Sequence, residues 1–476
     1  MTPLTYLFYD IETTGMNRAF DQIIQFASIR TDARLNEIDR YETMIKLRPD
    51  TIPSPGAMIT HRMPIERINA GLCEYDAVRQ IHRLANEPGT ISVGYNTLGF
   101  DDEFLRFAFY RNLLRPYSHQ YKNDCGRMDI LPMSTIFWLY KNDVIDWPEL
   151  EDGKPSLKLE LISALNELAE GPAHDAMVDV EATIELARRF AGNEKMWNFL
   201  RGYFRKKTDD GRAQTLPVSF HTDAGLHRYA LYVSNEFGAA QLYQTPVLGI
   251  GPSIPYSNQT LWLRLDRPEL QETKIEDVAE TTWVIRKKFG EPGILLPPKE
   301  RYLERLDEDR LKLVEENLAW LKSENDLFQE IIRYYREYEY PEVPNVDADA
   351  MLYLQGFLTD TERLTCEAFH NGPLERKIEL MTAFESNISQ ELAGRILIRN
   401  YPGELPGWLQ RQAEDYLTYV DPESPENAPV DYRGKKRLLP AQVLEEAAKL
   451  RDERELDAQQ LQLLAELEVY LKENFS

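Results

Sequence analysis

The chain has few cysteines and no long apolar run, and these shortages exclude several classes of protein. Its three cysteines, Cys73, Cys125 and Cys366, are odd in number and far apart, so they indicate neither a disulfide framework nor a zinc site. No stretch approaches the ~20 apolar residues of a membrane span, and the first apolar segment becomes charged too early for a secretory leader. We therefore expect a protein of the reducing cytoplasm.

Positive charge is also scarce, with 55 lysines and arginines against 79 aspartates and glutamates and a formal net charge of −24. A strongly acidic surface repels the phosphate backbone, so this balance alone argues against nucleic-acid binding. Net charge is an average over all surfaces, however, and a binding groove needs only local cations. Three clusters could supply them, or could be ordinary solvated surface: Arg205-Lys206-Lys207, Arg286-Lys287-Lys288 and Lys435-Lys436-Arg437.

The length of 476 residues and the order of the sequence patterns predict three domains. Residues 1–192 are expected to form an α/β domain with a mixed sheet, residues 196–344 a small β-rich domain with helical insertions, and residues 345–476 a helical domain. The expected strands are 4–10, 23–31, 41–47, 90–95, 227–233, 259–265 and 281–285. The expected helices before residue 345 are 75–86, 101–114, 132–140, 157–168, 175–191 and 307–338.

Two carboxylates follow an apolar segment near the start of the chain. Asp10 and Glu12 come after residues 6–9, which are apolar or aromatic and predict a buried strand. Alternate residues of a strand share a face, so the two carboxylates are expected side by side in one cleft. A bare Asp-x-Glu at a strand end more often faces solvent. This pair therefore indicates a functional site only in combination with further acidic residues.

A third carboxylate is expected where the strand at 90–95 leads into the next helix. Asp101 opens that helix, where a carboxylate is favoured as a cap and by the positive end of the helix dipole. Its neighbour Asp102 complicates the assignment, since either residue could cap the helix while the other faces the cleft. The strand-to-helix order favours Asp101 for the cleft.

His174 and Asp179 complete the set. On one ideal helix they would lie roughly 140° apart and could not share a site. Gly171-Pro172 and the capping residue Asp175 predict that the helix begins after His174, so that the histidine belongs to a loop and Asp179 to the helix. Taken singly, an acidic helix face and a lone histidine indicate nothing about function.

Together these residues predict a metal-dependent nuclease site. Four carboxylates in one cleft repel one another and take up protons unless divalent cations lie among them. Oxygen ligands favour Mg²⁺, with Mn²⁺ as a substitute. Two such ions would activate a water and stabilise a departing 3′ oxygen, and a neutral imidazole at His174 would take the proton of that water.

Short motifs spread over the chain resemble those of the Asp-Glu-Asp-Asp exonuclease superfamily, and more specifically the bacterial exonuclease I family. The histidine subclass is indicated because the position four before Asp179, where the other subclass has tyrosine, is Asp175. The motifs are Phe8-Tyr9-Asp10-Ile11-Glu12-Thr13, Gly94-Tyr95-Asn96, Phe100-Asp101-Asp102-Glu103, Phe109-Tyr110-Arg111-Asn112, Asp146-Trp147-Pro148, Ala173-His174-Asp175-Ala176-Met177, Asn345-Val346-Asp347-Ala348 and Arg399-Asn400-Tyr401-Pro402-Gly403.

The resemblance implies a ribonuclease H-like exonuclease domain, an SH3-like domain and a helical domain that together surround single-stranded DNA. It implies 3′-to-5′ degradation to 5′-mononucleotides and association with single-stranded-DNA-binding protein, and we expect a monomer. By position, two Mg²⁺ ions would be held by Asp10, Glu12, Asp101 and Asp179, with His174 as general base. Glu12 would also meet the terminal nucleotide.

The resemblance also implies contacts with the bound strand. Aromatic side chains stack on bases of any identity, and cations follow the phosphates. The implied residues are Arg106, Tyr117, Tyr121, Arg127 and Lys158. The family has tryptophan at position 121 and arginine at position 158, so this chain keeps the ring and the charge with less stacking area and without bidentate geometry. For Tyr117 and Tyr121, ordinary surface packing explains the residue equally well.

Two alternatives to a single-stranded-DNA exonuclease stay open. An RNA exonuclease or a polymerase proofreading subunit would use the same carboxylates, although such proteins are usually shorter or carry other appendages. A catalytically inactive nucleic-acid-binding scaffold is the second alternative, and the intact set of acidic residues argues against it.

Overall fold

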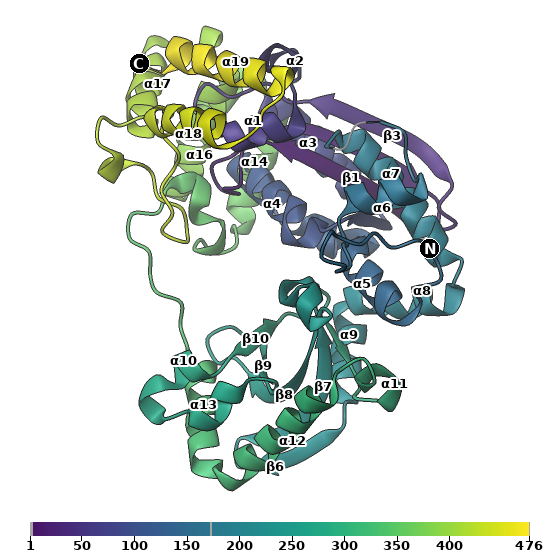
Figure 1. Cartoon of the computed structure of the whole chain (residues 1–476). Coiled ribbons are helices and arrows are strands. Elements are labelled where there is room, and N and C mark those ends of the chain that lie inside the picture. The colour runs from purple at the N-terminus through teal and green to yellow at the C-terminus, as the bar shows by residue number, and fades with distance from the viewer. Residues whose placement is uncertain (1–2, 172–173, 476) are drawn as a thin grey trace. The chain divides into compact units, whose positions relative to one another are not determined.

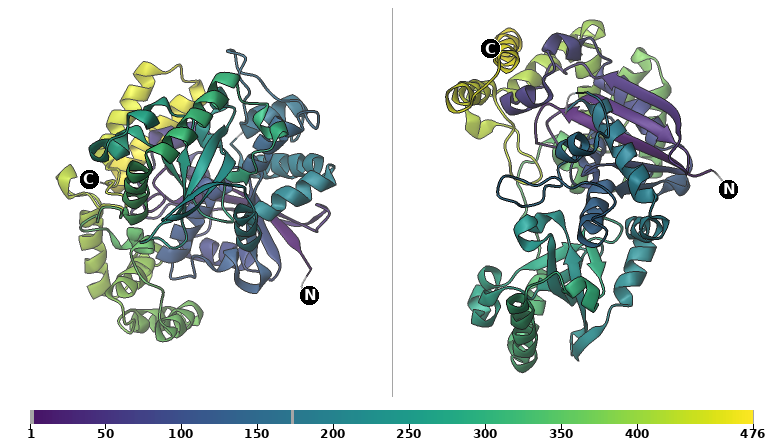
Figure 2. Two further views of the ribbon diagram at one scale, coloured as in Figure 1. Left: turned by 90° about the horizontal axis from the view of Figure 1, so that it is seen from below. Right: turned by 45° about the vertical axis from the view of Figure 1, so that its right-hand side comes forward.

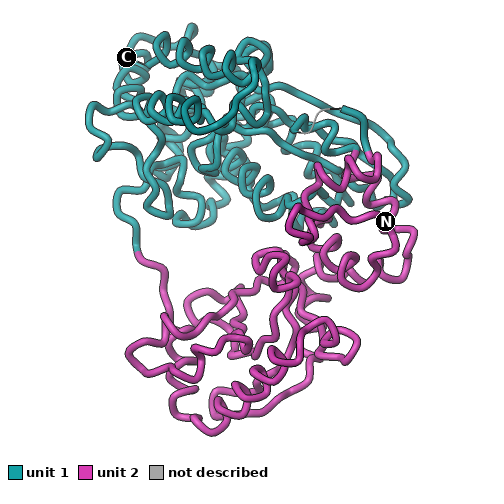
Figure 3. The backbone as a smooth tube through the Cα atoms, viewed as in Figure 1, with its two compact units in different colours: residues 1–127, 169–181, 342–476 teal, residues 128–168, 182–341 magenta. Residues whose placement is uncertain are grey.

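The computed structural model describes residues 3–171 and 174–475, and the chain separates into two compact units (Figure 3). Unit 1 contains residues 1–127, 169–181 and 342–476, and unit 2 contains residues 128–168 and 182–341. Unit 1 is therefore assembled from three separate segments of the chain. No helix in the described ranges is long and apolar enough to cross a membrane.

A five-stranded mixed sheet, in the order β3-β2-β1-β4-β5, organises the first part of the chain (Figure 1). β1 pairs antiparallel with β2 and parallel with β4, and β2 pairs antiparallel with β3, which confirms the expected mixed sheet. The strands are β1 Thr5–Thr13, β2 Ile23–Thr31, β3 Glu37–Met44, β4 Thr90–Gly94 and β5 Gly126–Asp129.

Among the described residues up to Ala191 there are seven α-helices, and five of them agree with the expected helices to within a few residues. The other two, α1 and α2, were not predicted, because 7 and 5 residues are too few to show an apolar period. The helices are α1 Pro55–His61, α2 Ile65–Asn69, α3 Glu74–Ala85, α4 Asp101–Arg111, α5 Ile130–Tyr140, α6 Leu159–Asn166 and α7 Ala176–Ala191.

The alternation of side chains along β1 separates an apolar face of the sheet from an acidic one. Tyr9 and Ile11 pack with Phe26 of β2 against α3 and α4, in a core that the chain buries completely. Since neighbouring strand residues point to opposite faces, Asp10 and Glu12 lie on the other side of the sheet. The packing of the core thus decides where the carboxylates point.

Unit 2 contains a second sheet, which follows the path β10-β9-β8-β7-β11 with β6 paired to β7. Helices α12 and α13 cover one of its faces through Val314, Leu321 and Phe328. Its strands are β6 Val218–Thr222, β7 Gly225–Val233, β8 Gln244–Pro252, β9 Thr260–Arg264, β10 Val284–Lys287 and β11 Ile294–Leu296. Its further helices are α8 Glu194–Arg201, α9 Lys206–Gln214, α10 Val278–Thr281, α11 Glu300–Leu303, α12 Glu308–Ser323 and α13 Asn325–Glu337.

Two expectations for this part of the chain were wrong in detail. The single helix expected at 307–338 is two helices, because Glu324 adopts a non-helical conformation with φ −93° and ψ 47° and caps the end of α12. The strand expected at 281–285 begins only at Val284, because Thr281 closes the short helix α10.

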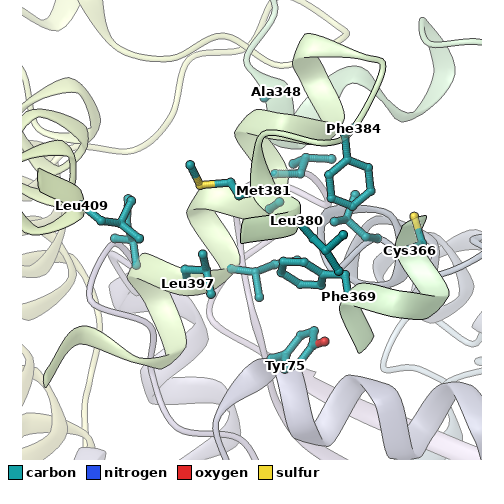
Figure 4. Packing of buried hydrophobic residues seen from close by; sticks show 14 of the residues in the cluster. Tyr75, Ala348, Cys366, Phe369, Leu380, Met381, Phe384, Leu397 and Leu409 are labelled. Carbon is teal, nitrogen blue, oxygen red and sulfur yellow. The ribbon is translucent and has the colours of Figure 1, made fainter. Parts of the chain in front are cut away.

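The last part of the chain is helical, as its sequence pattern predicts, and it packs on the first part within unit 1. Phe369, Leu380 and Leu397 share a core with Tyr75 of α3 (Figure 4). Helices α18 and α19 lie beside α1 in the views of Figures 1 and 2. The elements are the 3₁₀ turn η9 Ala348–Tyr353 and helices α14 Asp360–Asn371, α15 Leu374–Met381, α16 Asn387–Asn400, α17 Gly407–Val420, α18 Pro440–Glu453 and α19 Ala458–Asn474.

A buried ion network also joins the two ends of the chain inside unit 1. The carboxylate of Asp50 accepts hydrogen bonds from Arg399 at 2.9 Å and from Arg437 at 3.2 Å. Asp349 pairs with Arg399 and, at 3.2 Å, with Arg395. The network continues through Arg48, Glu74 and Arg111, all fully buried.

Candidate functional site

Acidic residues from separate elements of unit 1 converge on the acidic face of the first sheet. Glu12, His174 and Asp179 each offer one ligand atom, and these atoms all lie within 4.8 Å of one another. Asp10 and Asp101 complete the cluster, because the charges of Asp101, Asp179 and Glu12 all act on the Asp10 carboxylate. The structure therefore brings together the five residues that the sequence singled out.

The parallel pairing of β1 with β4 explains how Asp101 reaches Asp10. The carboxyl ends of two parallel strands meet at one edge of a sheet, and the pairing runs from Thr5 with Thr90 to Phe8 with Val93. Past that edge β1 continues to Asp10, while β4 ends at Gly94, and α4 starts soon after with Asp101. Gly94 is required there, since a Cβ would stand 2.8 Å from the carbonyl oxygen of Tyr9.

A glutamine that the sequence analysis did not select places helix α7 on the acidic face. Gln25 lies opposite Glu12 in the pairing of β1 with β2. Its side-chain oxygen accepts a hydrogen bond at 3.4 Å from the backbone N–H of Ala176, the first residue of α7. Asp179, one turn further along, is thereby held over the carboxylates of β1. A lone polar residue in a buried strand gave no indication of this role.

The histidine lies in a loop, as expected, and not in the helix that follows. α7 begins at Ala176, and the side chain of Asp175 accepts a hydrogen bond from the N–H of Met177 at 3.1 Å. His174 has a positive φ of 62°, which non-glycine residues adopt infrequently and which is common at functional sites. Pro172, on which this expectation partly rested, and Ala173, part of a motif that carries the family resemblance, lie outside the described residues.

The carboxylates raise one another's proton affinity. Burial and the charges of Asp179 and Asp101 raise the pKa of Glu12 from 4.5 to about 9. Burial, together with the charges of Asp101, Asp179 and Glu12, also raises the pKa of Asp10 well above its ordinary value. Such a cluster is stable in its ionised form only when compensated by positive charge, and its donor set of oxygens with one imidazole fits divalent cations.

Asp102, the alternative to Asp101, is occupied by partners of its own. Burial by itself would raise the pKa of its carboxyl, but Arg106 at 2.8 Å and Arg127 at 2.6 Å hold that pKa well below its usual range. His119 contacts the other carboxylate oxygen at 2.9 Å. Asp102 is thus fully buried and neutralised, while Asp101 acts on Asp10 and Glu12.

The residues expected to contact the strand lie in different surroundings. Arg106 and Arg127 are held by Asp102, and Arg106 lies 5.6 Å from the ring centre of Tyr117, which is half-buried. Tyr121 is 72% exposed, so its ring faces solvent. Lys158 belongs to unit 2, where its ammonium group contacts Glu160 at 3.4 Å. Their role in strand binding stays a prediction.

A second histidine near the site was also missed. His61 is buried at the end of α1, and its Nδ1 accepts a hydrogen bond from the N–H of Met63 at 3.0 Å. Burial and the proximity of His174 lower its pKa to about 4, so His61 is neutral at physiological pH. Helix α1 was not predicted, and the sequence therefore gave no reason to place His61 here.

Replacing Glu12 by glutamine is expected to stabilise the metal-free protein, increasingly so as the pH rises. Between pH 4.5 and about 9 the unfolded chain has lost the Glu12 proton that the folded protein keeps, so ionisation of Glu12 lowers the stability of the wild-type protein across this range, and the Glu12→Gln variant lacks this contribution. We expect a gain in unfolding free energy of at least ~1.4 kcal/mol at the alkaline end, equivalent to one pKa unit. Chemical denaturation of both proteins in EDTA at several pH values measures it.

Adding Mg²⁺ should reverse this difference, because cations compensate the ionised carboxylate and bind only the folded state. The wild-type protein should then gain more thermal stability from Mg²⁺ than the Glu12→Gln variant. A stability difference between the two proteins that stays constant from acidic to alkaline pH would contradict the proposed repulsion among the carboxylates of the site.

Comparisons with known proteins agree with this geometry. Residues 7–187 match the exonuclease family profile. The chain is 29% identical over 436 residues to exodeoxyribonuclease I of Escherichia coli, spanning 86% of this chain and 89% of the relative. It is 28% identical over 419 residues to exodeoxyribonuclease I of Haemophilus influenzae, spanning 83% and 86%.

A solved structure of Escherichia coli exonuclease I in complex with a 5cy-dA13 oligonucleotide matches the fold with a TM-score of 0.84 at 25% identity. The match covers 99% of this chain and 100% of that one. This likeness along the whole chain confirms the predicted fold class, a ribonuclease H-like exonuclease region followed by further β-rich and helical parts. The domain boundaries at residues 192, 196, 344 and 345 stay a prediction.

Proposed function

The chain is an exonuclease that resembles bacterial exodeoxyribonuclease I over most of its length, and from this premise we propose that it degrades single-stranded DNA from the 3′ end to 5′-mononucleotides. The observation that carries the proposal is the convergence of Glu12, His174 and Asp179 within 4.8 Å. Carboxylates beside an exposed loop histidine are the groups that phosphodiester hydrolysis requires.

The metal ligands in this proposal are Asp10, Glu12, Asp101 and Asp179, which would hold two Mg²⁺ ions. When bound, such ions supply the positive charge that activates the attacking water and stabilises the departing 3′ oxygen. Mn²⁺ offers the same oxygen preference and is expected to substitute. The raised pKa values of Asp10 and Glu12 support cation binding, because ions relieve the repulsion that causes them.

His174 is the proposed general base. The ring of His174 is exposed on its loop and lies close to Glu12 and Asp179. It can therefore reach the attacking water and pass the proton to solvent. Glu12, at the end of β1, is placed to meet the terminal nucleotide as well. The left-handed backbone of His174 holds the ring over the carboxylates, which is why the histidine and Asp179 can act together.

The proposed strand contacts follow from the family resemblance. Tyr121 offers an exposed ring on which a base can stack, and Tyr117 lies beside Arg106. Arg127 and Lys158 would contribute positive charge toward phosphates. The same resemblance supports association with single-stranded-DNA-binding protein, and we expect the chain to act as a monomer.

Digestion of end-labelled single strands tests the proposal. With Mg²⁺, a 3′-labelled DNA strand is expected to release its label at once as a mononucleotide, while a 5′-labelled strand shortens progressively. Matched RNA and duplex DNA are the controls, since a duplex presents no unpaired bases for stacking. Faster digestion of RNA than of DNA would favour an RNA exonuclease, and binding without turnover would favour an inactive scaffold.

A further inference from the structure

We propose that a cavity in unit 1, at the opposite end of α4 from Asp101, binds a nucleoside 5′-monophosphate. The cavity has a volume of about 280 Å³ and is lined by the end of α3, the segment that follows α4, and α14. This volume is near the lower end of the ~300–1,000 Å³ that small-molecule sites occupy. The choice of ligand rests on the proposed function, because a mononucleotide is the product of that reaction.

Positive charge exceeds negative charge along the walls of this cavity. The charged lining residues are Arg115, Lys122, Arg363 and Glu367. Lys122 is exposed, and within residues 3–171 and 174–475 it forms no ion pair. Backbone hydrogen bonds fix the turn that carries Lys122, since the carbonyl oxygen of Asn123 accepts from the N–H of Gly89 at 2.9 Å. In a chain with a net charge of −24, this local excess of cations is suited to an anion.

Arg115 can turn to a phosphate without losing a strong partner. Its guanidinium contacts Glu367 at 3.6 Å, and the two side chains are 45% and 62% exposed. An exposed pair of this kind contributes little to stability. A phosphate offers the guanidinium shorter, bidentate hydrogen bonds. Arg363 is held at 2.6 Å by Asp360 of its own helix and therefore adds only long-range charge.

The uncharged walls of the cavity suit a nucleoside. Leu114, Leu358 and Cys366 offer an apolar surface on which a base can pack. Asn86 donates to the carbonyl oxygen of His82 at 2.7 Å, and its side-chain oxygen can accept a hydrogen bond from a base or sugar. A ligand that joins a phosphate to a base uses both kinds of wall, whereas inorganic phosphate uses only one.

A metal ion is a less suitable occupant, although two histidines and a cysteine line the cavity. Both ring nitrogens of His370 are engaged by protein oxygens, at 2.8 and 3.0 Å, and Nε2 of His82 lies 3.1 Å from a carbonyl oxygen. Burial raises the pKa of the Cys366 thiol to about 12, so it is not a thiolate at neutral pH. The cationic side chains therefore decide the class of ligand.

Equilibrium dialysis of labelled dTMP against the metal-free protein in EDTA tests the cavity. Without metal, the carboxylates of the acidic site disfavour a phosphate there, and we expect one dTMP per chain. Lys122→Ala should raise the Kd roughly 10-fold or more, because a charge-assisted phosphate contact is lost. Glu367→Gln should lower the Kd, since an amide neither repels the phosphate nor holds Arg115. Both residues are exposed, so neither variant is expected to disturb the fold.

Lys449→Ala is the matched control, because it removes an exposed lysine of α18 outside the cavity, and its Kd should equal that of the wild-type protein. Thymidine and inorganic phosphate are dialysed in parallel, and each should bind roughly 10-fold or more weakly than dTMP. Inorganic phosphate that binds as tightly as dTMP would overturn the nucleotide in favour of a general anion site. The same Kd in the wild-type, Lys122→Ala and Glu367→Gln proteins would overturn the cavity as the binding site.

Asp179→Ala shows where the nucleotide binds. This variant changes the acidic site only, so its affinity for dTMP in EDTA should not fall. A loss of binding in Asp179→Ala would place the nucleotide in the acidic site and overturn the proposal. A protein that binds dTMP through Lys122 but digests no strand would defeat the proposed function alone. A protein that digests strands but shows one Kd in all variants would defeat the cavity alone.

Discussion

Asp179→Ala is expected to lower the rate of Mg²⁺-dependent mononucleotide release by roughly 1,000-fold or more. Asp179 lies with Glu12 and His174 in the group whose ligand atoms are within 4.8 Å, so its loss removes both a metal ligand and a neighbour of the proposed base. Charge stabilisation by bound ions is worth several kcal/mol, and about 4 kcal/mol corresponds to about 1,000-fold in rate. Single-turnover digestion of a 3′-labelled strand measures this directly.

Glu181→Ala on the same helix is the matched control. Its carboxylate points to Arg40 at 3.0 Å on the surface of unit 1, so the variant should keep most of the activity. Asp179→Ala should also retain strand binding in EDTA, because the variant leaves the proposed strand contacts, such as Tyr121 and Arg127, unchanged. Turnover within tenfold of wild type in Asp179→Ala would exclude the proposed arrangement of metal ligands, a tenfold change being only about 1.4 kcal/mol.

Arg399→Met is expected to destabilise the protein by about 3–5 kcal/mol, the usual effect of removing one partner from a buried ion pair. Arg399 bonds to Asp349 and, at 2.9 Å, to Asp50, and all three are buried. Loss of the Arg399 guanidinium leaves the buried carboxylates of Asp50 and Asp349 with less compensating positive charge. The melting temperature should fall by roughly 6–15 °C in a domain of this size.

Two further variants decide whether the network causes that loss. Arg376→Met removes an exposed arginine paired with Glu379 at 2.7 Å and should change stability by less than ~1 kcal/mol. The double variant Asp349→Asn with Arg399→Met should be more stable than the sum of the single effects, since a neutral amide no longer needs the arginine. Equal losses of unfolding free energy in Arg399→Met and Arg376→Met would show that the buried network contributes no more to stability than an exposed ion pair does.

Sequence patterns predicted the elements that carry long apolar stretches or short chemical motifs. Asp10, Glu12 and Asp101 could be placed because strand alternation and the strand-to-helix order fix where their side chains point. His174 could be assigned to a loop because Asp175 is a good helix cap. These are local rules, and they worked where a few neighbouring residues determine the conformation.

Residues whose position depends on tertiary contacts were not accessible in this way. Gln25 acquires its role only when Ala176, far along the chain, reaches it, and Asp102 differs from Asp101 only because Arg106, Arg127 and His119 surround it. The same holds for the side chains of Asn17 and Asp431, which form a hydrogen bond although 414 positions separate them. Nothing in the local composition of such residues distinguishes them from ordinary polar side chains.

The assembly of unit 1 from three separate segments has a consequence for biosynthesis. Asp50 is made early, but its partners Arg399 and Arg437 follow 349 and 387 positions later, so this buried network can form only when translation is nearly finished. A chain that ends before Arg399 keeps Asp50 without two of its arginine partners, so such a fragment should be less stable than the full chain.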